Sequence, residues 1–139
     1  MSKPEARSGS SAAPSRYIDT GPFWAAAADG RLLVQYSGST GARQLYPRPI
    51  DIRTGRRDLE WREVRGSGTL VSWTIVPSQP PDAGMPPHIA ALVDLHEGVR
   101  FLTSLVDSGT QLLRVGLPLE IAWVELADGR SWPAFRPAG

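Results

Sequence analysis

The sequence predicts an all-β protein, a closed five-stranded barrel preceded by a short helix and a turn-rich ribbon. The first observation is the long apolar stretch 88–106, which a polar turn ending in Gly98 divides into two arms. This pattern is typical of two antiparallel strands joined by a short loop, with Gly98 at positive φ. Neither arm alternates cleanly, so we expect both faces to be at least partly covered, as in a barrel. Five strands are predicted, near 69–76, 88–95, 99–106, 119–126 and 131–135.

Composition narrows the class of protein. The 139 residues suffice for one domain, or for a core with a small appendage, and 41% of them are apolar. No apolar run is long enough to cross a membrane, and the N-terminus lacks the build of a secretory signal. The absence of cysteine excludes thiolate zinc sites and a cysteine nucleophile. We therefore expect a cytoplasmic protein without disulfides or a membrane partner, and the net charge of +1 indicates no global electrostatic partner.

The chain divides into three predicted segments: an arm over 1–16, a helix and ribbon over 17–65, and a barrel over 66–139. The arm is rich in Ser, Ala, Pro and Gly, which predicts disorder. A short helix is predicted from Thr20 to Gly30, because Thr20 or Asp19 can cap it, Pro22 suits its first turn and Gly30 suits its end. A strand is expected to follow over 31–36.

Two aromatic residues, Phe23 and Trp24, stand at the start of the predicted helix. They can dock the helix onto the body of the protein, or they can contribute to a subunit interface, where aromatic residues are enriched. We therefore regard both as candidate partner-interface residues.

The ribbon over 37–55 contains two tight segments with the same spacing. Ser37 and Thr40 bound the first, Asp51 and Thr54 bound the second, and a glycine follows each segment. Four cysteines at these positions would ligate one tetrahedral zinc ion, but three hydroxyls and one carboxylate bind zinc poorly. We therefore expect no metal in this ribbon. Turn hydrogen bonds and the packing of three side chains are expected to hold it instead: Leu45, Tyr46 and Ile50.

Four stretches resemble one known family, the thiolase-associated OB-fold proteins, formerly catalogued as a domain of unknown function. They are YPRP at 46–49, GSGTLVSWTIV at 66–76, ALVDLHEGVR at 91–100 and WPAFRP at 132–137. The resemblance covers roughly residues 21–137 and implies a rubredoxin-like zinc ribbon ahead of an OB-fold barrel. This chain departs from the family in lacking all four zinc cysteines.

The resemblance implies a non-catalytic accessory subunit of a thiolase-like enzyme (a lipid-transfer-type thiolase, acyltransferase or aldolase) or of an acyl-CoA hydratase. Such a subunit takes part in carbon–carbon bond chemistry on acyl-CoA or acyl groups, in lipid, steroid or polyketide metabolism. It stabilises its partner in a hetero-oligomer and completes the substrate and coenzyme A tunnel, while the catalytic residues lie on the partner. Two alternatives stay open at this point: a stand-alone acyl-CoA or lipid-binding protein, and a single-stranded nucleic-acid binder.

Charge is unevenly distributed. Seven arginines against four acids give residues 43–65 a net charge of +3, whereas four arginines against seven acids give the rest of the chain from Gly66 a net charge of −3. Nucleic-acid-binding OB barrels carry a basic groove with aromatic residues, so nucleic acid is not the expected partner. Arg53, Arg56 and Arg57 are candidates for contacting the phosphates of coenzyme A, with a solvated basic face as the alternative. We expect no cofactor bound by this chain alone, and a coenzyme A thioester at the partner interface.

The proline-rich loop 77–87 is expected to face the partner, which makes Pro80, Pro81 and Met85 further interface candidates. Tyr46 of the ribbon is also an interface candidate. No catalytic residue is predicted, because neither His88 nor His96 has a nucleophile near it in the sequence. Within the hairpin, Asp94 and Arg100 are expected to form a pair across the two strands.

Overall fold

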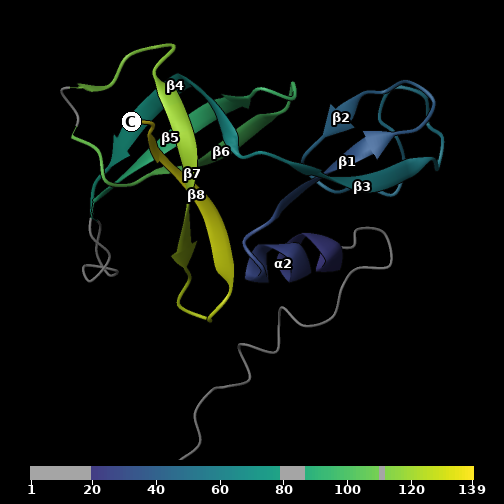
Figure 1. Cartoon of the computed structure of the whole chain (residues 1–139), viewed down its shortest axis with the longest axis horizontal. Coiled ribbons are helices and arrows are strands. Elements are labelled where there is room, and N and C mark those ends of the chain that lie inside the picture. Colours follow the sequence, from purple (N-terminus) through teal and green to yellow (C-terminus); the bar gives the residue numbers. More distant parts are fainter. Residues whose placement is uncertain (1–19, 79–86, 110–111) are drawn as a thin grey trace, which may run out of the picture. The chain divides into compact units, whose positions relative to one another are not determined.

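The computed structural model describes residues 20–78, 87–109 and 112–139 (Figure 1). The predicted arm over 1–16 and the loop positions Pro80, Pro81 and Met85 lie outside these ranges. The described chain forms two compact units, one of residues up to Val64 with 125–131 and the other of 65–124 with 132–139. In chain order the elements are α2 (Gly21–Ala28), β1 (Leu32–Ser37), β2 (Arg43–Gln44), β3 (Leu59–Val64), β4 (Ser67–Val76), β5 (His88–Leu95), β6 (Arg100–Leu105), β7 (Pro118–Glu125) and β8 (Ser131–Pro137).

Helix α2 belongs to the first unit and ends as the sequence predicts. Pro22 lies in its first turn, and Thr20 occupies the N-cap position without a side-chain capping bond. At the other end Gly30 has φ 73° and donates to the Ala27 carbonyl, while Arg31 donates to the Ala26 carbonyl. This pair of bonds is a Schellman motif. No helix in the described ranges is long and apolar enough to span a membrane.

The three strands of the first unit form one antiparallel sheet in the order β2-β1-β3. Strand β1 lies in the middle and pairs with β3 along its whole length, from Leu32 opposite Val64 to Ser37 opposite Leu59. Leu32 and Val34 are almost fully buried in the core that this sheet shares with α2. Because β1 is central, both of its ends are fixed, and the turn that follows Ser37 starts from a well-anchored position.

Three cation–π contacts lie within the first unit. The Arg62 guanidinium lies 3.9 Å from the centroid of the Tyr36 ring, and that of Arg43 lies 5.3 Å away. The guanidinium of Arg130, in the turn between β7 and β8, lies 4.1 Å from the centroid of Trp24. The sequence places 125–131 in the barrel segment, whereas the structure groups this hairpin tip with the first unit.

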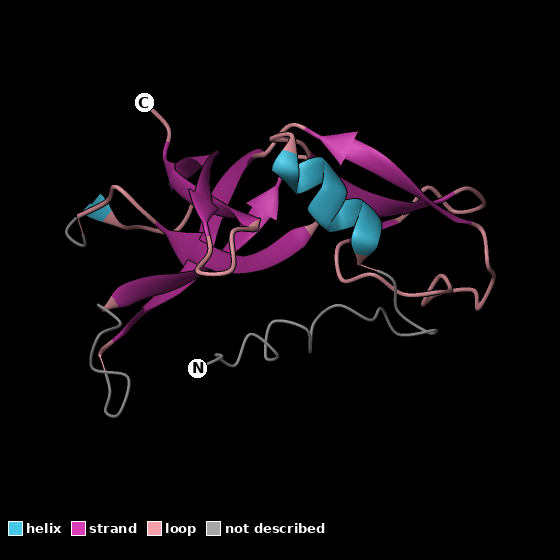
Figure 2. Cartoon of the chain, turned by 90° about the horizontal axis from the view of Figure 1, so that it is seen from below, coloured by secondary structure: helices cyan, strands magenta, loops and turns pink. Residues whose placement is uncertain are grey.

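The second unit is a closed barrel with strand order β4-β5-β6-β8-β7, and pairing of β7 with β4 closes it. Its meander β4-β5-β6 is antiparallel, whereas β8 pairs with β6 in parallel, with Leu105 opposite Phe135. Figure 2 shows the strands of the chain in magenta and its helices in cyan. Five large side chains fill the interior with less than 2% of their surface exposed: Leu70, Val93, Phe101, Leu119 and Phe135. The five-stranded OB-type barrel predicted from the sequence is confirmed.

One face of the 88–106 hairpin is buried in the barrel and the other is partly covered. Burial alternates along both arms: Val93 and Phe101 point into the barrel, while Leu92 is half-buried and Leu102 is 53% exposed on the outer face. The pattern of the sequence does not alternate because apolar side chains also occupy the outer face of β5 and β6. This leaves an exposed apolar area on the barrel wall.

In the sequence of strand β4, Val71, Trp73 and Ile75 alternate with Ser72 and Thr74, which predicts that these three face the core. The structure departs from this: a bulge between Leu70 and Ser72 shifts the pairing with β5, Leu70 lies opposite the buried Val93, and Val71 is half-buried. Ile75, opposite Ile89, is 54% exposed. The extra residue of a bulge reverses which side chains face inward beyond it. At the start of the strand, Gly68 lies so close to β5 that a Cβ would overlap the Asp94 carbonyl oxygen.

Candidate functional site

The ribbon positions singled out in the sequence form two turns with matching hydrogen bonds. In the first turn Gly41 N–H donates to the Ser37 carbonyl at 2.9 Å, and Ser37 N–H donates to the Ala42 carbonyl at 2.8 Å. Ala42 N–H also donates to the Thr40 hydroxyl at 3.2 Å. Gly41 ends the turn with φ 75°, a conformation that glycine adopts without strain.

The second turn repeats these bonds one for one. Gly55 N–H donates to the Asp51 carbonyl at 2.8 Å, and Asp51 N–H donates to the Arg56 carbonyl at 2.9 Å. Arg56 N–H donates to the Thr54 hydroxyl at 3.2 Å, and Gly55 has φ 74°. Two segments with the same spacing therefore fold into the same knuckle-shaped turn.

The two turns meet at the carboxylate of Asp51, whose residue is only 1% exposed. The Arg53 backbone N–H donates to Oδ1 of Asp51 at 2.8 Å, and the Thr40 hydroxyl donates to Oδ2 at 3.4 Å. The Arg53 N–H, aided by hydrogen bonds from the Ser37, Thr40 and Thr54 side chains, holds the pKa of Asp51 below its usual range. The four positions predicted to converge are thus brought together around an ionised carboxylate.

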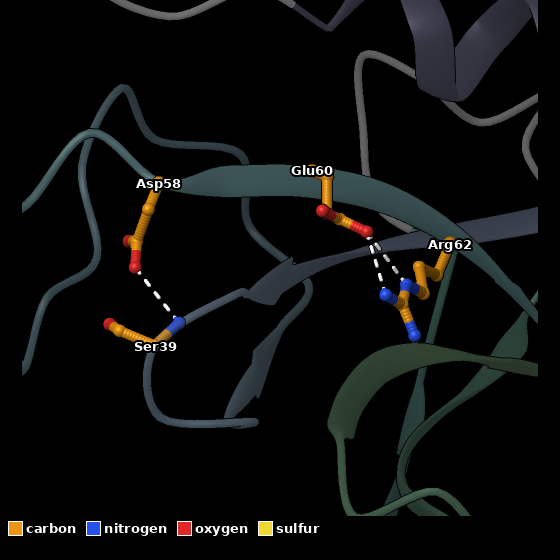
Figure 3. A network of polar contacts seen from close by, with 4 residues as sticks. All are labelled: Ser39, Asp58, Glu60 and Arg62. Carbon is orange, nitrogen blue, oxygen red and sulfur yellow. Dashed lines mark hydrogen bonds and ion pairs between the residues drawn. The ribbon is translucent and has the colours of Figure 1, made fainter.

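A second aspartate fastens the first turn to the start of β3. Asp58 accepts the backbone N–H of Ser39 at 3.0 Å and lies 3.5 Å from the Ser37 hydroxyl (Figure 3). Hydrogen bonds from Ser39 lower the pKa of Asp58. In the same view Arg62 extends along β3 and pairs with Glu60 at 2.8 Å. The sequence gives no sign that Asp58 joins the cluster of Ser37, Thr40, Asp51 and Thr54, because the expected spacing includes only those four positions.

This set of donors is chemically suited to closing the ribbon by hydrogen bonds. A carboxylate surrounded by hydroxyls and N–H groups is satisfied without a cation. Within the described ranges no group of three or more His, Cys, Asp or Glu side chains could hold a metal ion. That the ribbon works without metal stays a prediction.

The segment that connects the two turns is held by a residue that the sequence interpretation missed. Gln35, 6% exposed on β1, donates from Nε2 to the Arg48 carbonyl and accepts the Arg48 N–H at Oε1, both at 2.9 Å. Gln44 donates to the same Oε1 at 3.0 Å. Of the predicted packing residues, Leu45 is buried and Ile50 half-buried, but Tyr46 is 54% exposed and does not fill the ribbon core.

The other predicted site residues fall into two groups. Arg53, Arg56 and Arg57 are all exposed around the second turn. Phe23 is buried, and its ring packs edge to face against that of Trp24, with the ring centroids 5.1 Å apart. Both side chains therefore help to hold α2 in place. As contact points for coenzyme A or a partner these residues stay predictions.

The outer wall of the barrel carries an open groove of about 220 Å³ between β4, β5 and β6. Its lining is mostly small or apolar: Ser72, Trp73, Thr74, Ala90, Ala91, Leu92 and Leu102. The sequence does contain a signal for this groove. Apolar residues on the outer face of β5 and β6 are the reason that apolar and polar residues do not alternate cleanly along the hairpin.

That neither His88 nor His96 is catalytic stays a prediction. The His96 ring lies 3.3 Å from the Ser67 hydroxyl on an exposed hairpin end, and neither residue lines the groove. The predicted pair across the hairpin is confirmed: Arg100 contacts both carboxylate oxygens of Asp94, at 2.8 and 3.0 Å, and this lowers the pKa of Asp94. The pair leaves no free cation on this part of the barrel wall.

Comparison with known proteins identifies the barrel. Residues 61–124 match the model of the C-terminal OB-fold domain of ChsH2. A chain of the solved Ltp2–ChsH2(DUF35) aldolase is similar over 91% of this chain and 98% of its own length, with 29% identity and a TM-score of 0.79. A DUF35 protein of unknown function from Sulfolobus solfataricus shares the fold over 84% of this chain and 81% of its own, with 15% identity and a TM-score of 0.60.

A curated relative is known from Thermomonospora curvata, where it is named a probable enoyl-CoA hydratase alpha subunit. It is 32% identical over 117 residues, which are 84% of this chain but only 37% of the relative. The chain therefore spans little more than a third of that protein.

Proposed function

Because the chain belongs to the thiolase-associated OB-fold family, with a barrel of the ChsH2 C-terminal type, we propose that it is a non-catalytic accessory subunit of an acyl-CoA-processing complex. The observation that carries the proposal is the likeness over almost the whole of both chains to a chain of the Ltp2–ChsH2(DUF35) aldolase. The hydratase name of the relative from Thermomonospora curvata points to the same class of substrate.

In this proposal the partner is a thiolase-like or hydratase-like protein that carries the catalytic residues. The partner acts on acyl-CoA or acyl groups in carbon–carbon bond chemistry, and this chain stabilises it and completes its substrate tunnel.

The groove on the barrel wall weighs against the alternative of a stand-alone acyl-CoA binder. Pockets that enclose a drug-sized ligand hold roughly 300–1,000 Å³ and bury most of the ligand surface. At about 220 Å³ and open to solvent, the groove is too small to enclose an acyl-CoA by itself. It fits better as one wall of a site that a second protein completes.

Nucleic-acid binding is disfavoured by the same surface. Single-stranded nucleic acid needs a basic track with stacking aromatic residues. The only aromatic lining residue of the groove is the half-buried Trp73, and Arg100 nearby on β6 is neutralised by Asp94.

The direct test is purification of the tagged full chain from its native cells, with mass spectrometry of the proteins that co-purify. A thiolase-like or hydratase-like protein in stoichiometric amount is the expected result, and acyl-CoA turnover is expected from the complex but not from this chain. A chain that purifies as a monomer with no such partner would refute the proposal.

A further inference from the structure

The described arginines differ in whether an acid lies within ion-pair distance of them. Five of them are paired with a neighbouring acid at 2.8–3.6 Å: Arg31 with Glu63, Arg62 with Glu60, Arg100 with Asp94, Arg130 with Asp128 and Arg136 with Glu120. By contrast, none of the arginines at 48, 53, 56 and 57 has a described acid within ion-pair distance, and all four are exposed. The ribbon therefore concentrates unpaired cations in ten residues.

Acids are present in the same segment, but both carboxylates already accept hydrogen bonds within the ribbon. Asp51 is buried among the Arg53 N–H and three hydroxyls, and Asp58 accepts the Ser39 N–H at Oδ2, while its Oδ1 is buried without a partner. The segment 48–58 holds four arginines and two aspartates, so it keeps a net charge of +2. An approaching anion meets guanidinium groups at the surface, while the negative charges lie inside the ribbon.

The backbone that carries these arginines is fixed before any ligand arrives. Both ends of the second turn are joined by the bonds from Gly55 to Asp51 and from Asp51 to Arg56, and Gln35 holds the Arg48 backbone on both sides. A fixed backbone lowers the entropy cost of bringing several long side chains onto one ligand. Arginine suits such a site because its planar fork binds phosphate oxygens in pairs.

We propose that Arg53, Arg56 and Arg57, with Arg48 at the edge, form a binding site for phosphate groups. Resting on the proposed function, the ligand is the phosphorylated end of a coenzyme A thioester. The arginines surround one turn of five residues, which suits phosphates gathered at one end of a small ligand rather than the extended backbone of a nucleic acid. The acyl end of the same ligand would then reach the catalytic residues of the partner.

The test compares two triple variants of the full chain that lose the same charge. R53Q/R56Q/R57Q removes the unpaired arginines, and R31Q/R100Q/R136Q removes three exposed arginines that are paired with acids. Calorimetry measures the affinity for coenzyme A, and for dephospho-coenzyme A, which lacks the 3′-phosphate. Each measurement is made on the chain alone and in its purified complex, at low salt and at about 0.5 M salt, where exposed charges are screened. Circular dichroism checks that both variants are folded.

The site predicts that R53Q/R56Q/R57Q weakens coenzyme A binding at least about tenfold, because several charge-assisted bonds are lost. R31Q/R100Q/R136Q should change it by less than about threefold, since surface pairs contribute little. Wild-type affinity should fall with added salt and on loss of the 3′-phosphate. Equal losses in the two variants would overturn the site, because net charge alone would explain them.

Two other results would overturn the site while leaving the proposed function standing. One is a complex that binds coenzyme A equally well with wild-type chain and with R53Q/R56Q/R57Q. The other is loss of the partner from R53Q/R56Q/R57Q with no change in coenzyme A affinity, which would assign the arginines to an acidic protein surface. If no acyl-CoA-processing partner co-purifies, the subunit proposal fails, and calorimetry on the chain alone still decides the phosphate site.

Discussion

The side-chain amide of Gln35 binds the backbone of Arg48 as a neighbouring strand would. Its Nε2 donates to the Arg48 carbonyl and its Oε1 accepts the Arg48 N–H, each at 2.9 Å. The two residues are thirteen apart in the sequence. A buried strand residue thus holds the backbone at Arg48, beyond the two residues of β2 that pair with β1.

Replacing Gln35 by alanine should therefore destabilise the first unit. The variant removes the two bonds to the Arg48 backbone and the bond from Gln44, and each such hydrogen bond contributes about 0.5–1.5 kcal/mol. We expect Gln35→Ala to lower the free energy of unfolding, measured by urea denaturation, by about 2–4 kcal/mol. Gln44→Ala removes one bond to the same oxygen and should cost about 1 kcal/mol. Equal effects of the two variants would contradict the special role of Gln35.

A second prediction concerns the close approach of β4 and β5 at Gly68. A methyl group there would overlap the Asp94 carbonyl oxygen and lie 2.9 Å from its carbonyl carbon. Both atoms belong to the paired backbone, so relief requires the two strands to separate. Gly68→Ala should cost about 3 kcal/mol of unfolding free energy in urea denaturation, as overpacked sites do.

The matched control for Gly68 is Gly116, which has open space around it but φ 88°. Gly116→Ala should cost only about 1 kcal/mol, the strain of a left-handed backbone. If Gly116→Ala proved the more harmful variant, backbone conformation rather than strand contact would limit this barrel.

Acid should weaken the ribbon through Asp51. Its pKa is lower in the folded chain than the value of about 3.9 expected when unfolded. Its contribution to stability is therefore complete above about pH 4 and is lost as pH falls through the lower folded value. Asp51→Asn should lower stability at neutral pH and flatten its decline below pH 4, as followed by thermal unfolding at a series of pH values.

The control for this pH dependence is Glu63→Gln, which removes an exposed acid on β3 outside the cluster. It should keep the steep loss of stability in acid. The interpretation would fail if Asp51→Asn and wild type lost stability in parallel as the pH fell.

The sequence predicts the barrel well because its signals are local. The hairpin centred on Gly98 is marked by a polar turn between apolar arms, and the Asp94–Arg100 pair follows from positions on opposite sides of that turn. The two turns of the ribbon are equally visible, since a glycine follows the fourth residue of each. Short-range chemistry of this kind needs no knowledge of the rest of the fold.

What the sequence does not predict depends on long-range contacts. No residue near Gln35 in the sequence indicates that its side chain will contact the Arg48 backbone. The alternating pattern of the strand also does not indicate that the polar Gln35 is buried. The bulge at Val71 likewise results from pairing with β5, and it reverses the inward and outward positions along the rest of β4. The apolar type of Leu102 does not determine whether it faces the core, because only the closed barrel decides which face it occupies.

The geometry of the two turns leads to a last prediction, that the ribbon accepts zinc once thiolates replace its present side chains. The variant S37C/T40C/D51C/T54C places four cysteines where Asp51 and its three hydroxyl neighbours now converge. Four thiolates are a typical structural zinc set, with an apparent binding free energy of about 10 kcal/mol or more at neutral pH. We expect one equivalent of zinc by elemental analysis, and unfolding at lower temperature after chelation.

Two controls separate this outcome from incidental binding. The double variant S37C/T40C supplies thiolates from one turn only and should lose zinc on desalting, because a tetrahedral site needs both turns. Wild-type chain should unfold at the same temperature with and without chelator, since its buried carboxylate is already satisfied by hydrogen bonds. A quadruple variant that folds but retains no zinc would show that the four positions are not held closely enough to form a tetrahedral site. The matching hydrogen bonds of the two turns would then reflect local turn chemistry alone.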